Sequence, residues 1–272
     1  MWSFVVLLFP LVQSAISQCT INVKYDLTYP EPVFLKGDNL WVPSHGQLVW
    51  APAESNLIAC PKSNISTNSI VESYRPSFKV IGAPSTVLAA KFVSSLSYLA
   101  RGHMTPDADG IFRTWQWDTY FYVNVAPQWQ KVNGGNWLTV EKAVRSVADR
   151  LQGDVLVYTG TAGILTLPHE NGTDVPITLN VNGITVPKWT WKIVKSPSEN
   201  AAIAIITNND PYRTSIQYSD LLCDDICRLY GWYVPSFNTF SKGFTYCCTV
   251  SSLRSVIPTI PVDATAPNVL RL

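Results

Sequence analysis

Residues 124–151 read NVAPQWQKVNGGNWLTVEKAVRSVADRL, and this stretch contains the strongest secondary-structure signal of the chain. From Trp137 onward the apolar residues recur with the spacing of one buried helical face, which predicts a helix over Trp137–Leu151. Glu141 lies four residues after Trp137 and so shares the apolar side, where a carboxylate costs roughly several kcal/mol unless it is paired or solvated. Arg145 follows one helical turn later and is placed to meet it.

Two polar motifs precede this helix. The segment Ser95–Ala100 predicts a strand that ends at Arg101-Gly102-His103, and Tyr120–Val125 (YFYVNV) predicts a second strand that carries Asn124. Asn133 lies at the start of the helix. An imidazole, two amides, a carboxylate and two guanidinium groups can therefore converge, and this set suits metal-assisted hydrolysis of a phosphodiester.

The rest of the chain predicts short strands and turns, consistent with nineteen prolines and fourteen glycines. Short strands are expected between about residues 33 and 59. Further strands are expected at Asp154–Tyr158, Ile177–Val181, Ile184–Val194 and Ala202–Ile206. We therefore expect an α+β fold whose mainly antiparallel mixed sheet carries the segment of residues 95–151 as an embedded motif.

Composition limits the functions that are possible. Of 272 residues, 47% are hydrophobic and 14% charged, so a large core can form. The formal charge of +1 excludes a histone-like polycation but permits a local basic groove. Lys131, Lys188, Lys192 and Lys195 are candidates for such a groove, although solvated surfaces carry similar lysines. The chain contains no Walker loop and no Gly-x-Gly-x-x-Gly motif, so no nucleotide cofactor is expected.

The N-terminus resembles a secretory signal. An apolar run at Phe4–Val12 is too short to cross a bilayer, and small residues at Ala15 and Ser17 fit a cleavage site. We expect residues 1–17 to be removed, a single domain over residues 18–272, an extracellular location and no membrane anchor. Asn64 and Asn171 begin glycosylation sequons that suit this compartment.

The six cysteines, Cys19, Cys60, Cys223, Cys227, Cys247 and Cys248, agree with export. Adjacent cysteines pair poorly with each other, so we expect the last four to form two bridges across the C-terminal region. Cys19 is then left to pair with Cys60. A zinc site is the weaker alternative, because no Cys-x-x-Cys motif occurs and histidines are few.

Taken together, the motifs resemble the DNA/RNA non-specific endonucleases of the ββα-metal, or His-Me finger, class. The matching pieces are Arg101-Gly-His103, Asn124-x-x-Pro-Gln128 and Asn133-x-x-x-Trp-x-x-x-Glu141, followed by Arg145. The sequence is most similar to secreted arthropod nucleases, including double-stranded ribonucleases of digestive fluid. The resemblance implies a secreted enzyme, acting in digestive or salivary fluid, that cleaves RNA or DNA with little sequence preference.

The resemblance also implies a mechanism and the roles of the site residues. His103 is the general base, Asn133 binds Mg²⁺ directly (Mn²⁺ can replace it), and Glu141 binds it through water. Arg101 and Arg145 bind phosphate oxygens, and Asn124 positions the site. Gln128 and Lys192 are expected to contact substrate. Cleavage would leave 5′-phosphate ends, and the enzyme would act as a monomer or homodimer.

One position departs from the family pattern. Many members have an Asp directly before Arg-Gly-His, where this chain has Ala100. Asp107 or Asp109 could supply a carboxylate, but Asp-Ala-Asp-Gly is also an ordinary turn. The alternative function is therefore a nuclease-fold glycoprotein that only binds nucleic acid or a protein partner. Each residue also has an ordinary interpretation, such as a structural histidine or a Glu141–Arg145 salt bridge, but the joint pattern favours catalysis.

Overall fold

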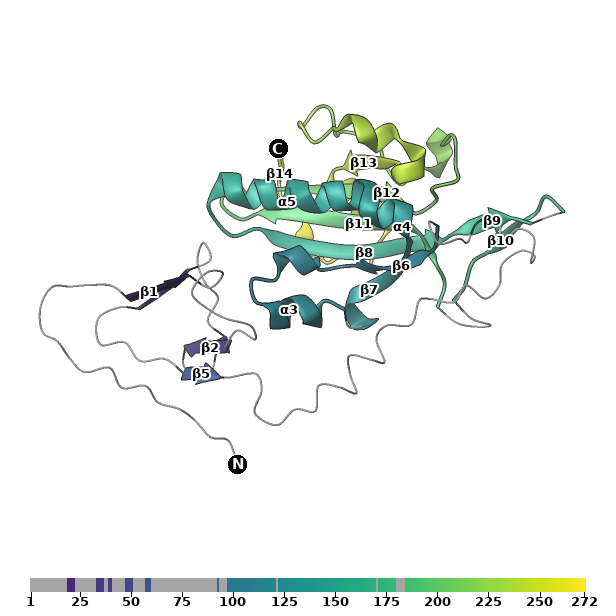
Figure 1. Ribbon diagram of the computed structural model, residues 1–272. Helices are drawn as coiled ribbons and strands as arrows, with labels where there is room; N and C mark the ends of the chain where they lie inside the picture. The colour runs from purple at the N-terminus through teal and green to yellow at the C-terminus, as the bar shows by residue number, and fades with distance from the viewer. Residues whose placement is uncertain are drawn as a thin grey trace, which may run out of the picture. The chain divides into compact units, whose positions relative to one another are not determined.

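The computed structural model of the protein (Figure 1) describes the strand backbones within residues 19–59, and residues 92, 97–120, 122–169, 171–179 and 184–272. Its contacts divide the chain into two compact units. The first contains residues 1–75 and 106–121, and the second contains residues 76–105 and 122–272. The expected signal peptide, Cys60 and Asn64 lie outside the described residues, as does the side chain of Cys19.

The first unit contains short strands, as the sequence predicts. Its elements are β1 (Cys19–Asn22), β2 (Val33–Lys36), β3 (Asn39–Leu40), β4 (Gln47–Trp50), β5 (Leu57–Ala59), the 3-10 helix η1 (Asp107–Asp109) and α3 (Arg113–Asp118). Strand β1 pairs with β4, and β2 pairs with both β3 and β5, all antiparallel. In the register of β2 and β3, Lys36 pairs with Asn39 and Leu35 pairs with Leu40.

The second unit holds a five-stranded sheet flanked by helices. Its elements are β6 (Leu99–His103), η2 (Tyr122–Asn124), β7 (Val125–Trp129), α4 (Gln130–Val132), the π-helix η3 (Asn133–Trp137), α5 (Leu138–Leu151), β8 (Leu156–Ile164), β9 (Thr166–Pro168), β10 (Asp174–Pro176), β11 (Pro187–Ser196), β12 (Ala201–Asn208), η4 (Tyr218–Asp220), η5 (Pro235–Asn238), η6 (Phe240–Lys242), β13 (Thr245–Cys248), α6 (Val250–Val256), η7 (Val262–Ala264) and β14 (Asn268–Val269). The α+β class that the sequence predicts is confirmed.

Strands β13, β12, β11 and β8 form the antiparallel path of this sheet, and β14 adds to β12 in parallel. Three of the predicted strands correspond to β8, β11 and β12, with shifted ends. The strand predicted over Ile177–Val181 is wrong for its described part, because Thr178 makes only an isolated bridge to Thr185. The strand in this region is instead β10, which pairs with β9.

Side chains of β11 alternate between two buried faces of the sheet. Trp189, Trp191 and Ile193 belong to a core with the aromatic ring of Tyr246. Val194 belongs to the opposite core, which also contains buried residues of α5. Both faces are covered, so nearly all of β11 and β12 is buried. Thr190 and Lys192 share the face of Val194, which places two polar side chains under the helix layer.

Helix α5 lies along one face of the sheet (Figure 1) and forms where the sequence predicts it. Its buried residues Val140, Val144 and Val147 pack in one core with β11 and β12. The helix ends at Leu151, and Gln152 adopts a left-handed conformation with φ of 50°. Among the described residues, no helix is long and apolar enough to cross a membrane.

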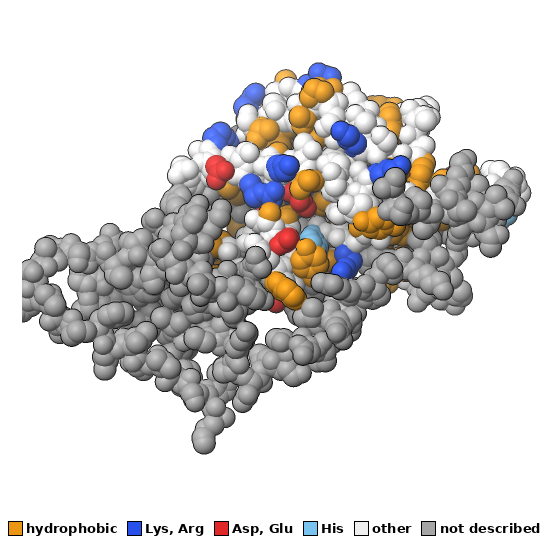
Figure 2. All heavy atoms as spheres, viewed as in Figure 1, with side chains coloured by type: hydrophobic (Ala, Val, Ile, Leu, Met, Phe, Trp, Pro, Cys, Tyr) orange, Lys and Arg blue, Asp and Glu red, His pale blue; other side chains and the backbone are white. Residues whose placement is uncertain are grey.

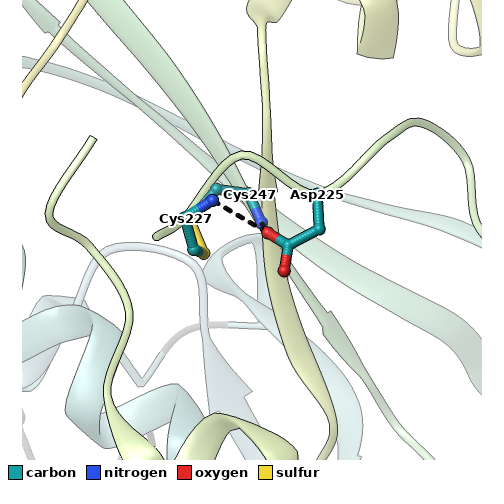
Figure 3. A group of neighbouring side chains, drawn as sticks. All are labelled: Asp225, Cys227 and Cys247. Carbon is teal, nitrogen blue, oxygen red and sulfur yellow. Dashed lines mark hydrogen bonds between the residues drawn. A yellow bond between two sulfur atoms is a disulfide. The ribbon is translucent and has the colours of Figure 1, made fainter. Parts of the chain in front are cut away.

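Two disulfides join the C-terminal segments, Cys223–Cys248 and Cys227–Cys247, which confirms the expected pairing of these four cysteines. Asp225 lies beside the second bridge, where its Oδ1 accepts the backbone N–H groups of Cys227 at 2.9 Å and Cys247 at 3.1 Å (Figure 3). Aspartate and cysteine can both bind metal ions, but here the sulfur atoms of Cys227 and Cys247 are bonded to each other. The cluster is therefore a disulfide whose two backbone N–H groups donate to Asp225, and it is not a zinc site.

Candidate active site

Strands β6 and β7 form the antiparallel pair that carries the Arg-Gly-His motif. The motif lies inside β6 and not after it, because the strand begins at Leu99 and includes His103. In the register of the pair, Arg101 faces Pro127 and His103 faces Val125. A β-carbon on Gly102 would lie 2.8 Å from Gln128 Cβ and 2.6 Å from its Oε1. Glycine is therefore required here for close packing of the two strands.

The strand predicted over Tyr120–Val125 is wrong. Tyr122–Asn124 forms a 3-10 turn, β7 begins at Val125, and the Val123 side chain is 95% exposed. The amide of Asn124 explains the difference, since it bonds both polar groups of the Thr105 backbone. Its Oδ1 accepts the Thr105 N–H and its Nδ2 donates to the Thr105 carbonyl, each at 2.9 Å. The Asn124 side chain thus takes the place of a paired strand beyond the end of β6 and holds the Thr105 backbone there.

A π-helical turn connects β7 and α4 to the long helix. Asn133 begins this turn, and Gly135 within it has non-helical backbone angles (φ −98°, ψ −119°). A β-carbon on Gly135 would lie 2.7 Å from the Lys242 carbonyl oxygen, so the kink needs glycine. Such π-turns occur often at functional sites. Beyond it, Glu141 and Arg145 lie half-buried on α5, one turn apart.

The donor set at this turn fits a hard divalent cation. Asn133 Nδ2 points to Gln130 Oε1 at 3.5 Å, which turns the Asn133 amide oxygen away from Gln130. An amide oxygen and the Glu141 carboxylate, with water between, are the kind of oxygen ligands that Mg²⁺ takes. Asn133 is half-buried, so part of the residue is accessible to solvent.

Trp137 joins the helix to the histidine strand. Its indole is fully buried, and its Nε1 donates to the backbone carbonyl of His103 at 3.3 Å. The residue that carries the imidazole is thus tied to the segment that holds Asn133 and Glu141. His103 itself is half-buried at the end of β6.

Two residues expected to contact substrate lie in the core instead. Gln128 is 1% exposed and its Nε2 lies 3.3 Å from Thr190 Oγ1, so it packs β7 onto β11. Lys192 is also 1% exposed, and its ammonium donates to Met104 and Thr159. Neither side chain can reach a phosphate from this position, because the surrounding protein already encloses it.

Sequence reasoning missed two buried amides that support the site. Asn209 bonds the backbone of β7, and Asn136 donates from the π-turn to the carbonyls of Ser236 at 2.7 Å and Gly243 at 2.6 Å. Both are fully buried. The signal for Asn209 was a polar run, Asn208-Asn209-Asp210, at the end of a buried strand. Polar residues at such a position must find hydrogen-bond partners.

The remaining candidates lie apart from this cluster or in the other unit. Asp107 and Asp109 belong to η1 of the first unit, where Tyr120 donates to Asp107 at 3.3 Å. Asn171 is exposed in the loop between β9 and β10. Trp129, Trp189 and Trp191 are buried and cannot stack on the bases of a substrate, whereas Trp117, in the first unit, is 47% exposed.

The surface beside the site carries basic and acidic side chains. Figure 2 shows Lys and Arg side chains spread over the face that carries α5, with Asp or Glu side chains between them and beside a histidine. Lys131 on α4 and Lys142 on α5 are exposed.

Elsewhere, burial raises the pKa of Asp220, but Arg213 at 2.8 Å and Lys188 at 3.5 Å outweigh the effect of burial and hold that pKa below its usual value. Lys188 is therefore engaged in a structural ion pair.

Comparison with known proteins identifies relatives of this arrangement. The chain is 38% identical to a salivary endonuclease of Lutzomyia longipalpis over 58% of this chain and 38% of that protein. It is 28% identical to the salivary protein Tsal1 of Glossina morsitans morsitans over 68% of this chain and 47% of that protein. A salivary endonuclease of Culex quinquefasciatus is 27% identical over 61% of this chain and 45% of that protein.

The matched part of this chain spans less than half the length of each of these relatives. The family model of the DNA/RNA non-specific endonucleases matches residues 60–253, which include β6, β7, the π-turn and α5. The chain therefore belongs to the DNA/RNA non-specific endonuclease family.

Proposed function

We propose that this protein is a secreted, metal-dependent endonuclease that hydrolyses phosphodiester bonds of RNA, DNA or both, with double-stranded RNA as the preferred substrate and little sequence preference. One observation carries the proposal: the Trp137 indole bonds the His103 backbone at 3.3 Å, which joins the strand of the base to the metal-binding helix. Membership of the family supports the same activity. The relatives named salivary endonucleases support a secreted role.

In the proposed reaction, neutral His103 removes a proton from the attacking water. Arg101 precedes it by two residues on β6, so both side chains project from the same face of the strand. Arg101 and Arg145 bind the non-bridging phosphate oxygens and stabilise the charge that grows in the transition state. The oxygen atoms of Asn133 and Glu141 would hold Mg²⁺, which when bound neutralises phosphate charge and stabilises the leaving oxygen.

A digestion assay tests this function. Secreted wild-type protein is incubated with double-stranded RNA and with duplex DNA, with Mg²⁺ and with EDTA. We expect cleavage only with the metal, 5′-phosphate ends, and faster cleavage of double-stranded RNA. Equal rates in EDTA would contradict the metal role. We also expect Mg²⁺ to raise the melting temperature of the wild type, and to leave that of an Asn133→Ala variant unchanged.

A second candidate function is binding of nucleic acid without cleavage, and Ala100 is the observation that favours it. Ala100 lies on β6 opposite Gln128, where many family members carry a carboxylate. If folded wild-type protein binds duplexes but cleaves neither substrate, the binding function replaces the first. In that case Ala100→Asp should restore cleavage, because it supplies the carboxylate that the family pattern has directly before the Arg-Gly-His motif.

Two features of the mature protein are part of the proposal. We expect N-terminal sequencing of secreted protein to begin at Gln18. The exposed Asn171 should carry glycan, so removal of N-glycans should increase its electrophoretic mobility. The Asn171→Gln variant, tested beside Asn64→Gln, assigns the modified position. An unchanged mobility of the wild type would exclude glycosylation at both.

A further inference from the structure

Lys192 places an ammonium group inside the protein beneath the proposed active site. It lies on β11, on the same face as Val194, and only 1% of the residue is exposed. Its Nζ donates to the Met104 carbonyl at 2.9 Å and to Thr159 Oγ1 at 2.7 Å. The same ammonium lies 5.1 Å from the centre of the Trp137 ring, within the range of a cation–π contact.

These contacts converge on two consecutive carbonyl groups. Trp137 binds the carbonyl of His103 through its indole nitrogen, and Lys192, which touches the Trp137 ring, binds the carbonyl of Met104. A cation and an aromatic ring in mutual contact therefore hold the carbonyl groups of two consecutive peptide bonds, the one that follows His103 and the one that follows Met104. Thr159 fixes the ammonium from β8, so the support is anchored in the central sheet.

A buried cation is costly, which makes the choice of lysine informative. Burial of an ammonium group costs several kcal/mol unless hydrogen bonds compensate, and apolar replacements of buried ions are often neutral or stabilising. Packing alone would be served equally well by a methionine or leucine at this position. The lysine is instead bonded to the residue after the proposed base, which points to a requirement for its geometry.

We propose that Lys192 is a positioning residue that sets His103 against the metal-binding helix. This inference rests on the proposed nuclease function for its kinetic test. It replaces the expectation that Lys192 contacts substrate. The ammonium acts through the Met104 carbonyl and the Trp137 ring, and not through a phosphate, because its side chain is enclosed by protein.

The test compares Lys192→Met with Lys195→Met. Lys195 lies on the same strand, but its side chain projects from the face of Ile193, opposite to α5, and donates to the carbonyl of Asp263. It is therefore not part of a groove beside the site, and it is a matched control for the loss of a lysine–carbonyl bond. For Lys192→Met we expect kcat to fall about 10- to 100-fold, since small misplacement of a catalytic group has effects of this size. We expect KM and the salt dependence of binding to stay unchanged, and Lys195→Met to keep the wild-type kcat.

Two kinetic outcomes would overturn the proposal. If Lys192 bound phosphate, Lys192→Met would raise KM and reduce the salt slope of binding by about one. If Lys192 only stabilised the fold, the melting temperature would fall while kcat at low temperature stayed unchanged. If Lys192→Met does not fold, Thr159→Val removes one acceptor of the ammonium and should lower kcat in the same way without raising KM.

An NMR measurement separates this inference from the nuclease function. The chain has three histidines, so the imidazole ring signals are few, and His103→Ala identifies the signal of His103. We expect Lys192→Met to move the His103 signal and Lys195→Met to leave it in place, whether or not the wild type cleaves nucleic acid. An unmoved His103 signal in Lys192→Met would overturn the positioning role.

Discussion

The side-chain oxygen of Asn209 accepts the backbone N–H of Trp129 at 2.9 Å, in the interior of the second unit. Its Nδ2 donates to the carbonyls of Pro127 at 3.1 Å and Pro187 at 2.9 Å. The Asn209 side chain therefore makes hydrogen bonds to β7 that a neighbouring strand would otherwise make, and it connects the β6–β7 pair to β11. The position of His103 over the sheet depends on this attachment.

Replacement of Asn209 by alanine should destabilise the protein by at least about 2 kcal/mol, because it leaves buried backbone groups without partners. Urea unfolding measures the loss. Asn238→Ala is the control, since Asn238 is exposed and donates to the Tyr233 hydroxyl at the surface. The control should change the unfolding free energy by less than about 0.5 kcal/mol. Equal stability of the two variants would contradict the role of Asn209.

Gly102→Ala should destabilise the protein by about 1–3 kcal/mol, because the new methyl group has no space against Gln128 and the Ala126 carbonyl. Cleavage should slow about tenfold or more, since Arg101 and His103 flank the displaced residue. Gly153→Ala is the matched control, because its β-carbon would meet only the Leu151 carbonyl oxygen at 3.6 Å. A Gly102→Ala variant that unfolds and cleaves like the Gly153→Ala variant would show that the strands are not tightly packed.

Asp220 makes a pH-dependent contribution to stability. Burial raises its pKa, but Arg213 and Lys188 together hold the pKa below the ordinary carboxyl value. A lowered folded-state pKa means that the contribution is present above the unfolded pKa of about 3.9 and is lost as pH falls through the folded pKa. Asp220→Asn should therefore lower the unfolding free energy by up to about 1 kcal/mol at neutral pH.

That difference should disappear as the pH falls through the lowered folded-state pKa of Asp220, because the wild-type carboxylate is then protonated as well. Thermal unfolding at neutral and acid pH compares Asp220→Asn with Asp154→Asn, which removes an exposed carboxylate. A constant difference at both pH values would mean that the salt bridges with Arg213 and Lys188 contribute nothing.

Much of this arrangement could be predicted from local patterns. The helix over Trp137–Leu151 was predictable because one apolar face recurs every three to four residues, and its valines are buried as expected. That Cys223, Cys227, Cys247 and Cys248 form two bridges followed from the strain of an adjacent pair, whereas the choice between the two remaining pairings came from the structure. The Arg-Gly-His, Asn and Glu motifs could be recognised in the sequence because their residues lie close together along the chain.

The rest depends on contacts between distant segments. The aromatic run before Val125 has strand propensity, but the Asn124 side chain bonds the Thr105 backbone and forms a turn there. Lys192 resembles any basic surface residue until the burial of β11 on both faces is known. The polar run at residues 208–210 indicates that Asn209 needs hydrogen-bond partners, but not that its partner Trp129 lies 80 positions away in the sequence. Long-range packing therefore decided which polar residues lie inside.

The most direct test of the catalytic role is the cleavage rate of His103→Ala measured beside His169→Ala. His169 lies in the loop after β9, where its Nδ1 accepts the Asn171 N–H at 3.3 Å, and it has no proposed part in the reaction. With Mg²⁺ and double-stranded RNA, we predict that His103→Ala slows cleavage about 10²- to 10⁴-fold at unchanged melting temperature, as loss of a general base does. His169→Ala should cleave like the wild type. Cleavage by folded His103→Ala at the wild-type rate would contradict the assignment of the base.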